Sequence, residues 1–304
     1  MRELIKILVF IISTVLLGCI LAPPLYWLGH AVGDSGLWPF LSEFEFHRYF
    51  TRAILIAAIV LLWPLLRALQ IRRWSDLGLA ANPARIRHIL LGFLFASLGL
   101  GITAAILVVT DRAYMRDAIR YANLPNALLS GVVVAFIEES LFRGALFGAL
   151  RKSFTWLKAL IILSIVFAAL HFLKPPDNIQ FDTVTWISGF ELFPQLFWQY
   201  GDPILLFGGF LTLIIFSLVL GFTVVQTKSL YAAMGLHAGW VFALKGFKQF
   251  GRLKGEPSIW VGSDLLTGLV PVFLVAATGA LMSFYLYKEK RNSISGRNLP
   301  RDTP

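Results

Sequence analysis

The sequence has few charged residues and a single cysteine. Of its 304 residues, 14% are charged and 57% are hydrophobic. This balance lies outside the range of soluble globular domains, so it excludes a water-soluble fold. The lone Cys19 excludes an intramolecular disulfide and a cysteine-based metal cluster. The sequence also lacks internal repeats, low-complexity tracts and a dividing linker, which predicts one domain.

Apolar runs of membrane-spanning length recur along the chain. They are continuous and do not alternate with polar residues, which favours helices over a β-barrel. We therefore expect an all-α, polytopic membrane helix bundle of about eight transmembrane helices, with residues 1–287 as its single domain. Residues 288–304 are basic and polar and predict a disordered tail. The expected spans are 5–28, 53–66, 89–109, 127–150, 159–173, 204–225, 230–244 and 265–287.

The net charge of +10 raises the question of an acidic partner. The Lys and Arg residues are spread over the segments that flank the spans, so we expect a lipid bilayer as partner and no nucleic acid. Their excess in alternate segments predicts that both termini are cytoplasmic, in a bacterial cytoplasmic membrane. Four basic residues oppose that orientation, because they fall on the outer side: Lys245, Lys248, Arg252 and Lys254.

One long segment between spans, residues 174–203, is rich in aromatic residues and holds one basic residue. It follows His171 directly and could form a lid over a site. The simpler interpretation is a belt of aromatic rings at the level of the lipid headgroups.

Three ionisable residues interrupt the fourth apolar run, where charges are costly and usually functional. Glu139 and Arg143 are four residues apart, so on a helix they can pair and neutralise each other. Glu138 is rotated by about 100° from Glu139 around the helix axis and faces another neighbour. This predicts a structural role for Glu139 and a chemical role for Glu138. A buried ion pair that only fixes helix packing explains Glu139 and Arg143 equally well.

Two histidines, His171 and His237, lie in the fifth and seventh apolar runs, at depths within the hydrocarbon layer. Each alone could be a hydrogen-bond donor between helices. Together with Glu138 they suit water activation, in which the carboxylate takes a proton from water and an oxyanion forms. The same three side chains could instead hold a zinc ion. The residues by themselves leave both alternatives open.

Three segments resemble the motifs of the CPBP family, also called Abi, which contains CAAX proteases and bacteriocin-processing enzymes. EESLFR, from Glu138 to Arg143, resembles the EExxxR motif, and FAALH, ending at His171, resembles the FxxxH motif. SLYAAMGLHAGWV, with His237, is similar to the third motif. The resemblance covers about residues 126–244.

This resemblance implies an intramembrane endopeptidase that cleaves a membrane-associated peptide or protein. In the family, the first glutamate activates water with the FxxxH histidine, which transfers to Glu138 and His171. Glu139 and Arg143 would support the site, and His237 would bind the oxyanion or a metal. Members are often called metalloproteases, with Zn²⁺ as the metal, although a metal-free glutamate route has also been proposed.

One residue departs from the family pattern. The third motif commonly has Asn or Asp four residues after the histidine, where this chain has Val241. Valine cannot donate a hydrogen bond, and the loss of one oxyanion donor costs on the order of 3 kcal/mol in other enzymes. This favours an alternative, a non-catalytic membrane scaffold or immunity protein of the same fold. A proton-coupled transporter is a further alternative, because intramembrane Glu, His and Arg also relay protons.

Overall fold

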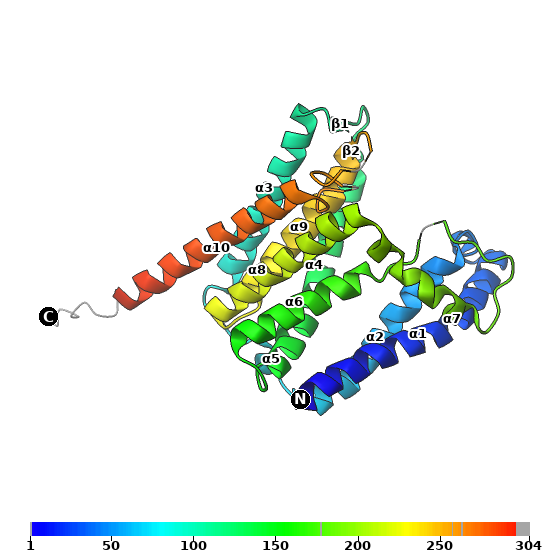
Figure 1. The fold of residues 1–304 in the computed structure, drawn as a ribbon, viewed down its shortest axis with the longest axis horizontal. Coiled ribbons are helices and arrows are strands. Elements are labelled where there is room, and N and C mark those ends of the chain that lie inside the picture. The colour runs from blue at the N-terminus through cyan, green and yellow to red at the C-terminus, as the bar shows by residue number, and fades with distance from the viewer. Residues whose placement is uncertain (1, 177, 257, 263, 296–304) are drawn as a thin grey trace. The chain divides into compact units, whose positions relative to one another are not determined.

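The computed structural model describes residues 2–176, 178–256, 258–262 and 264–295, and these are mainly helical (Figure 1). Every expected span coincides with a helix, so the all-α membrane fold class is confirmed. The helices are α1 (Arg2–Asp34), α2 (Phe46–Ala68), α3 (Arg85–Val109), α4 (Leu124–Glu139) with η4 (Ser140–Leu146) and α5 (Phe147–Leu150), α6 (Trp156–Phe172), η6 (Leu205–Phe210) with α8 (Leu211–Thr227), α9 (Tyr231–Phe250) and α10 (Leu269–Ser295).

Within the described part of the chain, five helices are each long and apolar enough to cross a membrane. They are Arg2–Asp34, Phe46–Ala68, Arg85–Val109, Leu205–Thr227 and Leu269–Asn292. The fourth apolar run is continuous from α4 to α5 but contains the π-helical segment η4. The helix α6 is apolar but shorter, at 17 residues. Most of the expected spans therefore reach the length of about 20 residues that is common for a membrane helix.

Two features differ from expectation at the ends of these helices. A short antiparallel pair, β1 (Ala113–Met115) and β2 (Gly251–Leu253), joins the segment after α3 to the end of α9. Strands of three residues are too short to show an alternating pattern, so the sequence did not reveal them. The helix α10 also continues to Ser295 through the first part of the predicted tail. The rest of that tail, residues 296–304, lies outside the described residues.

The chain divides into two compact units, and the first comprises Met1–Arg72 and Ala169–Pro203. Here α1 packs against α2, and the aromatic segment adds α7 (Ser188–Leu192) and η5 (Phe193–Gly201). This segment was expected as a loop, but Leu192 and Leu196 pack into the core of the unit with Cys19. A Cβ on Gly189 would overlap the carbonyl oxygen of Cys19, so α7 lies directly against α1. These contacts support neither the lid nor the aromatic belt as the role of this segment.

The second unit comprises Arg73–Ala168 and Ile204–Pro304, with α9 packed against α3, α4 and α8. Every residue from Ala232 to Trp240 is buried. Gly235 and Gly239 lie on one face of α9, and a Cβ at either position would overlap a carbonyl oxygen of α3, that of Ile89 or Phe93. Small residues four apart let membrane helices approach this closely. The glycines therefore fix the position of α9, the helix that carries His237.

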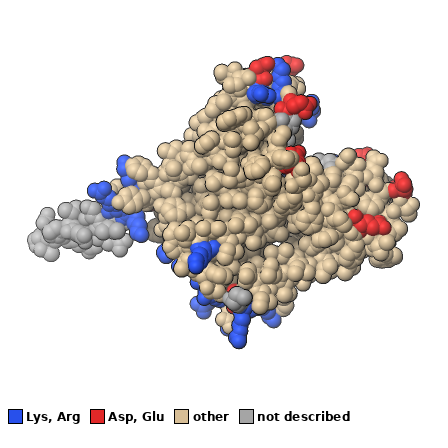
Figure 2. Space-filling view, viewed as in Figure 1, with Lys and Arg blue, Asp and Glu red and all other residues tan. Residues whose placement is uncertain are grey.

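Charged side chains also gather at the ends of the second unit. Figure 2 shows acidic and basic side chains together at the end of this unit where β1 and β2 lie, with uncharged residues over the adjoining helices. Near the start of α3, the buried His88 contacts Glu289 of α10, with 2.8 Å between Nε2 and Oε2, and Arg87 also pairs with Glu289. Such pairs hold α10 against α3 at the opposite end of that helix from β1.

Candidate active site

The two glutamates lie at the end of α4, where the helix changes its geometry. Glu139 is the last residue of α4, and the next seven residues form the wider π-helical turn η4. A π-helical turn inside an α-helix is rare and is often found at functional sites. It changes the angular position of the following residues around the axis, Arg143 among them. The continuous rod from α4 to α5 thus presents all three ionisable residues within about one and a half turns.

Glu139 and Arg143 form the ion pair that their spacing predicted. The distance from Arg143 Nη1 to Glu139 Oε1 is 3.0 Å, and both side chains are fully buried. The other terminal nitrogen of Arg143 donates to Ser217 on α8, at 2.9 Å to Oγ and 3.3 Å to the carbonyl oxygen. Because a buried charge is costly without partners, these contacts are what make the arginine tolerable inside the bundle. The pair also ties the α4–α5 rod to α8.

His237 of α9 forms a hydrogen bond with the carboxylate of Glu139. Its Nδ1 lies 2.7 Å from Glu139 Oε1, the oxygen that also accepts from Arg143. A carboxylate at this distance fixes the proton on Nδ1 and leaves Nε2 for another partner. The ring is nearly perpendicular to that of Phe216, with 5.1 Å between centroids, which further restricts its orientation. Nδ1 of His237 is thereby bonded to Glu139, and Nε2 remains for a second partner.

Glu138 is the group that faces this second nitrogen. Its Oε2 lies 3.9 Å from His237 Nε2, and its side chain keeps 25% of its surface exposed, against none for Glu139. The distance is longer than a direct hydrogen bond. A water molecule about 2.8 Å from each atom could, however, bond to both at once. The two adjacent glutamates thus have different surroundings, and the chemical role of Glu138 stays a prediction.

Aromatic rings enclose the ionic cluster. The guanidinium of Arg143 lies 4.6 Å from the centroid of the Phe167 ring, within the range of a cation–π contact. Phe167 stacks on Phe216 with 14° between the ring planes, and Phe216 in turn packs against the buried Trp240. This apolar wall lowers the local dielectric constant and so strengthens the interactions among the charged groups.

The remaining predicted site residue, His171, belongs to the other compact unit. It is the last residue but one of α6, and it lies in the Ala169–Pro203 segment of the first unit. The structure therefore brings together Glu138, Glu139, Arg143 and His237, which all lie in the second unit. A role for His171 beside Glu138 stays a prediction.

Sequence reasoning missed two residues of the cluster. Ser217 accepts from Arg143, and Phe216 packs against the imidazole of His237. Ser217 is a fully buried polar residue in the apolar helix α8, and this could have marked it as a partner for a buried charge. Phe216 carries no such signal, since phenylalanine is common in this chain.

The cluster of the second unit does not by itself form a metal site. In the part of the chain that the structure describes, no group of three or more His, Cys, Asp and Glu side chains is arranged to hold a metal ion. A catalytic zinc ion needs three protein ligands, and here Glu139 and Nδ1 of His237 already bond to each other. Glu138 Oε2 and His237 Nε2 would supply two. We therefore derive no chemical step through a metal.

Comparison with known protein families finds a match over part of the chain. Residues 120–243 match the family model described as type II CAAX prenyl endopeptidase Rce1-like. That range includes the α4–α5 rod, α6, α8 and most of α9. The match confirms the resemblance to the CAAX protease family over this segment. No curated protein and no solved structure matches the chain.

Proposed function

Taking residues 120–243 as a segment of the Rce1-like family, we propose that this protein is an intramembrane endopeptidase. It would hydrolyse a peptide bond in a membrane-associated peptide or protein. The observation that carries the proposal is the position of His237, with Nδ1 on the buried Glu139 and Nε2 toward the partly exposed Glu138. An imidazole held by one carboxylate and facing a second, more accessible one is an arrangement suited to proton transfer.

In the proposed reaction, a water molecule bonds to Glu138 Oε2 and is deprotonated as it attacks the scissile carbonyl. The proton passes to the Glu138 carboxylate, and the carbonyl becomes a tetrahedral oxyanion. His237, when protonated, donates from Nε2 to that oxyanion, while Glu139 stabilises the imidazolium at Nδ1. The proton on Glu138 then moves to the leaving amine, which departs with its nitrogen neutral. His171 is proposed to assist Glu138 in binding the water, as the family motif implies.

Arg143 and Ser217 act as positioning residues in this scheme. They bond to Glu139 or to each other and have no role at the reacting atoms. By bonding to the Glu139 carboxylate, Arg143 keeps that carboxylate in place to orient His237. This explains why a chain would retain a buried arginine in lipid, where its burial is costly.

The test compares Glu138→Gln with the wild-type protein in liposomes that contain membrane peptides of the host. We expect cleavage to fall by at least 100-fold, about 2.7 kcal/mol, because glutamine cannot accept the proton. Glu43→Gln, which changes an exposed carboxylate in the first unit, serves as the matched control. Cleavage by Glu138→Gln at the wild-type rate, with the protein folded and inserted, would overturn the proposal.

Val241 supports a second candidate, a non-catalytic membrane scaffold or immunity protein. It occupies the position, four residues after His237, where a donor is common in the family, and it is half-buried on α9. This candidate predicts no peptide hydrolysis by the purified protein and full biological function in the Glu138→Gln variant. The same two proteins therefore distinguish the two candidates.

The helices that can cross a bilayer make the protein an integral membrane protein. We further propose that both termini face the cytoplasm, on the excess of Lys and Arg in alternate segments. A protease-accessible tag at either end, tested in intact cells and in inverted vesicles, measures this orientation. Cleavage of the tag from outside intact cells contradicts it.

A further inference from the structure

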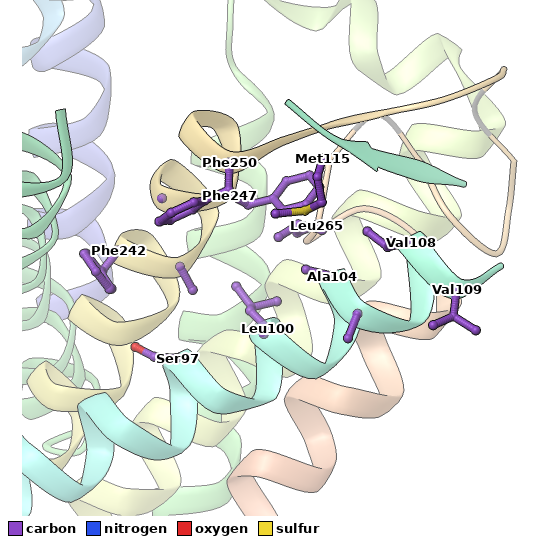
Figure 3. Close-up of a pocket in the computed structure, with 14 residues that line it drawn as sticks. Ser97, Leu100, Ala104, Val108, Val109, Met115, Phe242, Phe247, Phe250 and Leu265 are labelled. Carbon is purple, nitrogen blue, oxygen red and sulfur yellow. The ribbon is translucent and has the colours of Figure 1, made fainter. Parts of the chain in front are cut away.

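An apolar cavity of the second unit lies away from the ionic cluster, between the later halves of α3 and α9. It has a volume of about 500 Å³, within the usual range for small-molecule sites. Its walls are apolar, with Leu100 and Ala104 from α3 and Phe242 and Phe247 from α9. Figure 3 shows Phe247 together with Met115 and Leu265 at the end of the cavity next to β1. Nothing in the proposed hydrolysis uses this space.

The polar group at the other end of the cavity is already satisfied. Ser97 donates its hydroxyl to the carbonyl oxygen of Gly239, at 3.3 Å. From Ser97 to Val109 the cavity follows α3 for about 18 Å, at 1.5 Å per residue. One leaflet of a bilayer has about 15 Å of hydrocarbon, half of the usual 30 Å. The cavity therefore has the length and lining of a site for one acyl chain.

A second cavity adjoins the first and is basic. It has a volume of about 360 Å³ and shares Phe247 and Leu265 with the apolar cavity. Arg116, Lys248 and Arg252 line it. Arg116 is held in place by its Nε, which donates to the carbonyl oxygen of Lys248 at 3.1 Å. An apolar cavity thus continues directly into a basic one.

The positive charge of this second cavity is available to a ligand. Neither Lys248 nor Arg252 pairs with an acidic side chain of the described residues, whereas the nearby Lys254 pairs with Asp111 at 2.7 Å. Asp264 also lines the cavity, but its Oδ1 accepts from the backbone of Leu266 and the hydroxyl of Thr267. With three basic side chains against this one carboxylate, the cavity has a net positive charge.

From these observations we propose that the two cavities form one binding site for an anionic phospholipid of the bilayer. One acyl chain lies along α3 in the apolar cavity, and the phosphate binds Arg116, Lys248 and Arg252 at the end of α9. Val109 and Met115 line the apolar cavity and are exposed, so the acyl chain can enter beside them. Lys248 and Arg252 are two of the four basic residues that oppose the predicted orientation. The site explains their presence there, because the lipid phosphate neutralises them.

The test measures how phosphatidylglycerol binds to the purified full-length protein in neutral detergent, by native mass spectrometry. Gly101 lines the apolar cavity, and a Cβ there meets no atom within 4 Å. Gly101→Phe should fill the cavity and weaken binding at least tenfold. Gly148→Phe is the matched control, since Gly148 is also an exposed helical glycine with open space, but lies on α5. Ala104→Phe repeats the test at a second lining position.

The headgroup is tested separately with Lys248→Gln/Arg252→Gln. A basic residue near an anionic surface contributes about fivefold in affinity, so the double change should weaken binding about 25-fold at low salt. Arg151→Gln/Lys158→Gln, which removes two exposed charges elsewhere in the unit, should leave it unchanged.

Three results would overturn the proposal. One is undiminished phosphatidylglycerol binding to Gly101→Phe and Ala104→Phe. Another is equal binding of zwitterionic phosphatidylcholine, which would mean an apolar groove without headgroup recognition. The third is capture of an apolar peptide with a free carboxylate in place of the lipid. None of these depends on peptide hydrolysis, so the lipid site and the proposed enzymatic function can fail independently.

Discussion

His237 Nδ1 and Glu139 Oε1 lie 2.7 Å apart in the interior of the bundle, and neither side chain is more than 4% exposed. The two residues are 98 positions apart in the chain. This contact joins the third motif to the first and makes the buried glutamate a support for the histidine. It therefore predicts that changes at Glu139 affect both stability and catalysis, whereas changes at Glu138 affect catalysis alone.

The buried ion pair gives the first prediction. Glu139→Ala leaves the Arg143 guanidinium without its carboxylate, and such a loss typically destabilises a protein by about 3–5 kcal/mol. The double variant Glu139→Leu/Arg143→Met removes both charges and should recover most of this. Unfolding in mild detergent, followed by circular dichroism, measures both. Equal destabilisation by the single and double variants would show that the charge is not the cause.

Ser217 gives a milder effect. Ser217→Ala removes the hydroxyl that accepts from Arg143 but keeps the backbone carbonyl contact, so we expect a loss of about 2 kcal/mol. Ser164 is a matched control, because its hydroxyl is also buried but has no hydrogen-bond partner among the described residues. Ser164→Ala should leave the unfolding midpoint nearly unchanged. A larger effect at Ser164 than at Ser217 contradicts the assigned role.

The packing of α9 on α3 predicts strong sensitivity at Gly239. Gly239→Val forces a side chain against the backbone of Phe93, which cannot move as a flexible side chain can. Overpacking of this kind costs about 1–3 kcal/mol or more. Gly148→Val, on open surface, is the control. Expression level and thermal unfolding of the two variants should separate clearly, and similar values would mean that the helices do not pack as closely as described.

His237 is expected to matter for turnover. His237→Gln keeps an amide near Glu139 but cannot become the charged donor that His237 presents to the oxyanion, so kcat should fall by about 10²–10³. An effect limited to KM would instead point to substrate binding. Thermal unfolding of the same variant shows whether the fold is intact.

Val241→Asn tests the one departure from the family motif. An amide at this position lies one turn after His237 on the same face of α9 and could donate to an oxyanion. If the proposed reaction takes place, cleavage should rise, by up to about 100-fold. Val241→Leu keeps the position apolar and should not increase it. No gain in the asparagine variant would show that this position is not beside the reacting carbonyl.

The sequence determined the features that depend on neighbouring residues. Runs of apolar residues specify helices wherever they occur, because backbone groups in lipid must bond within their own segment. The Glu139–Arg143 pair follows from a spacing of four on one helix, and the contrast between Glu138 and Glu139 follows from their angular separation.

Only the tertiary structure decided which distant residues meet. Ser217 reaches Arg143 across 74 positions, and the two strands that lie beside the cavities are too short to leave a pattern. In the sequence, nothing distinguishes Gly235 and Gly239 from other small residues. Only the structure shows that the backbone of α3 lies against them. Such contacts depend on how the helices pack, and packing is determined by the fit of whole helix surfaces, which local periodicity does not specify.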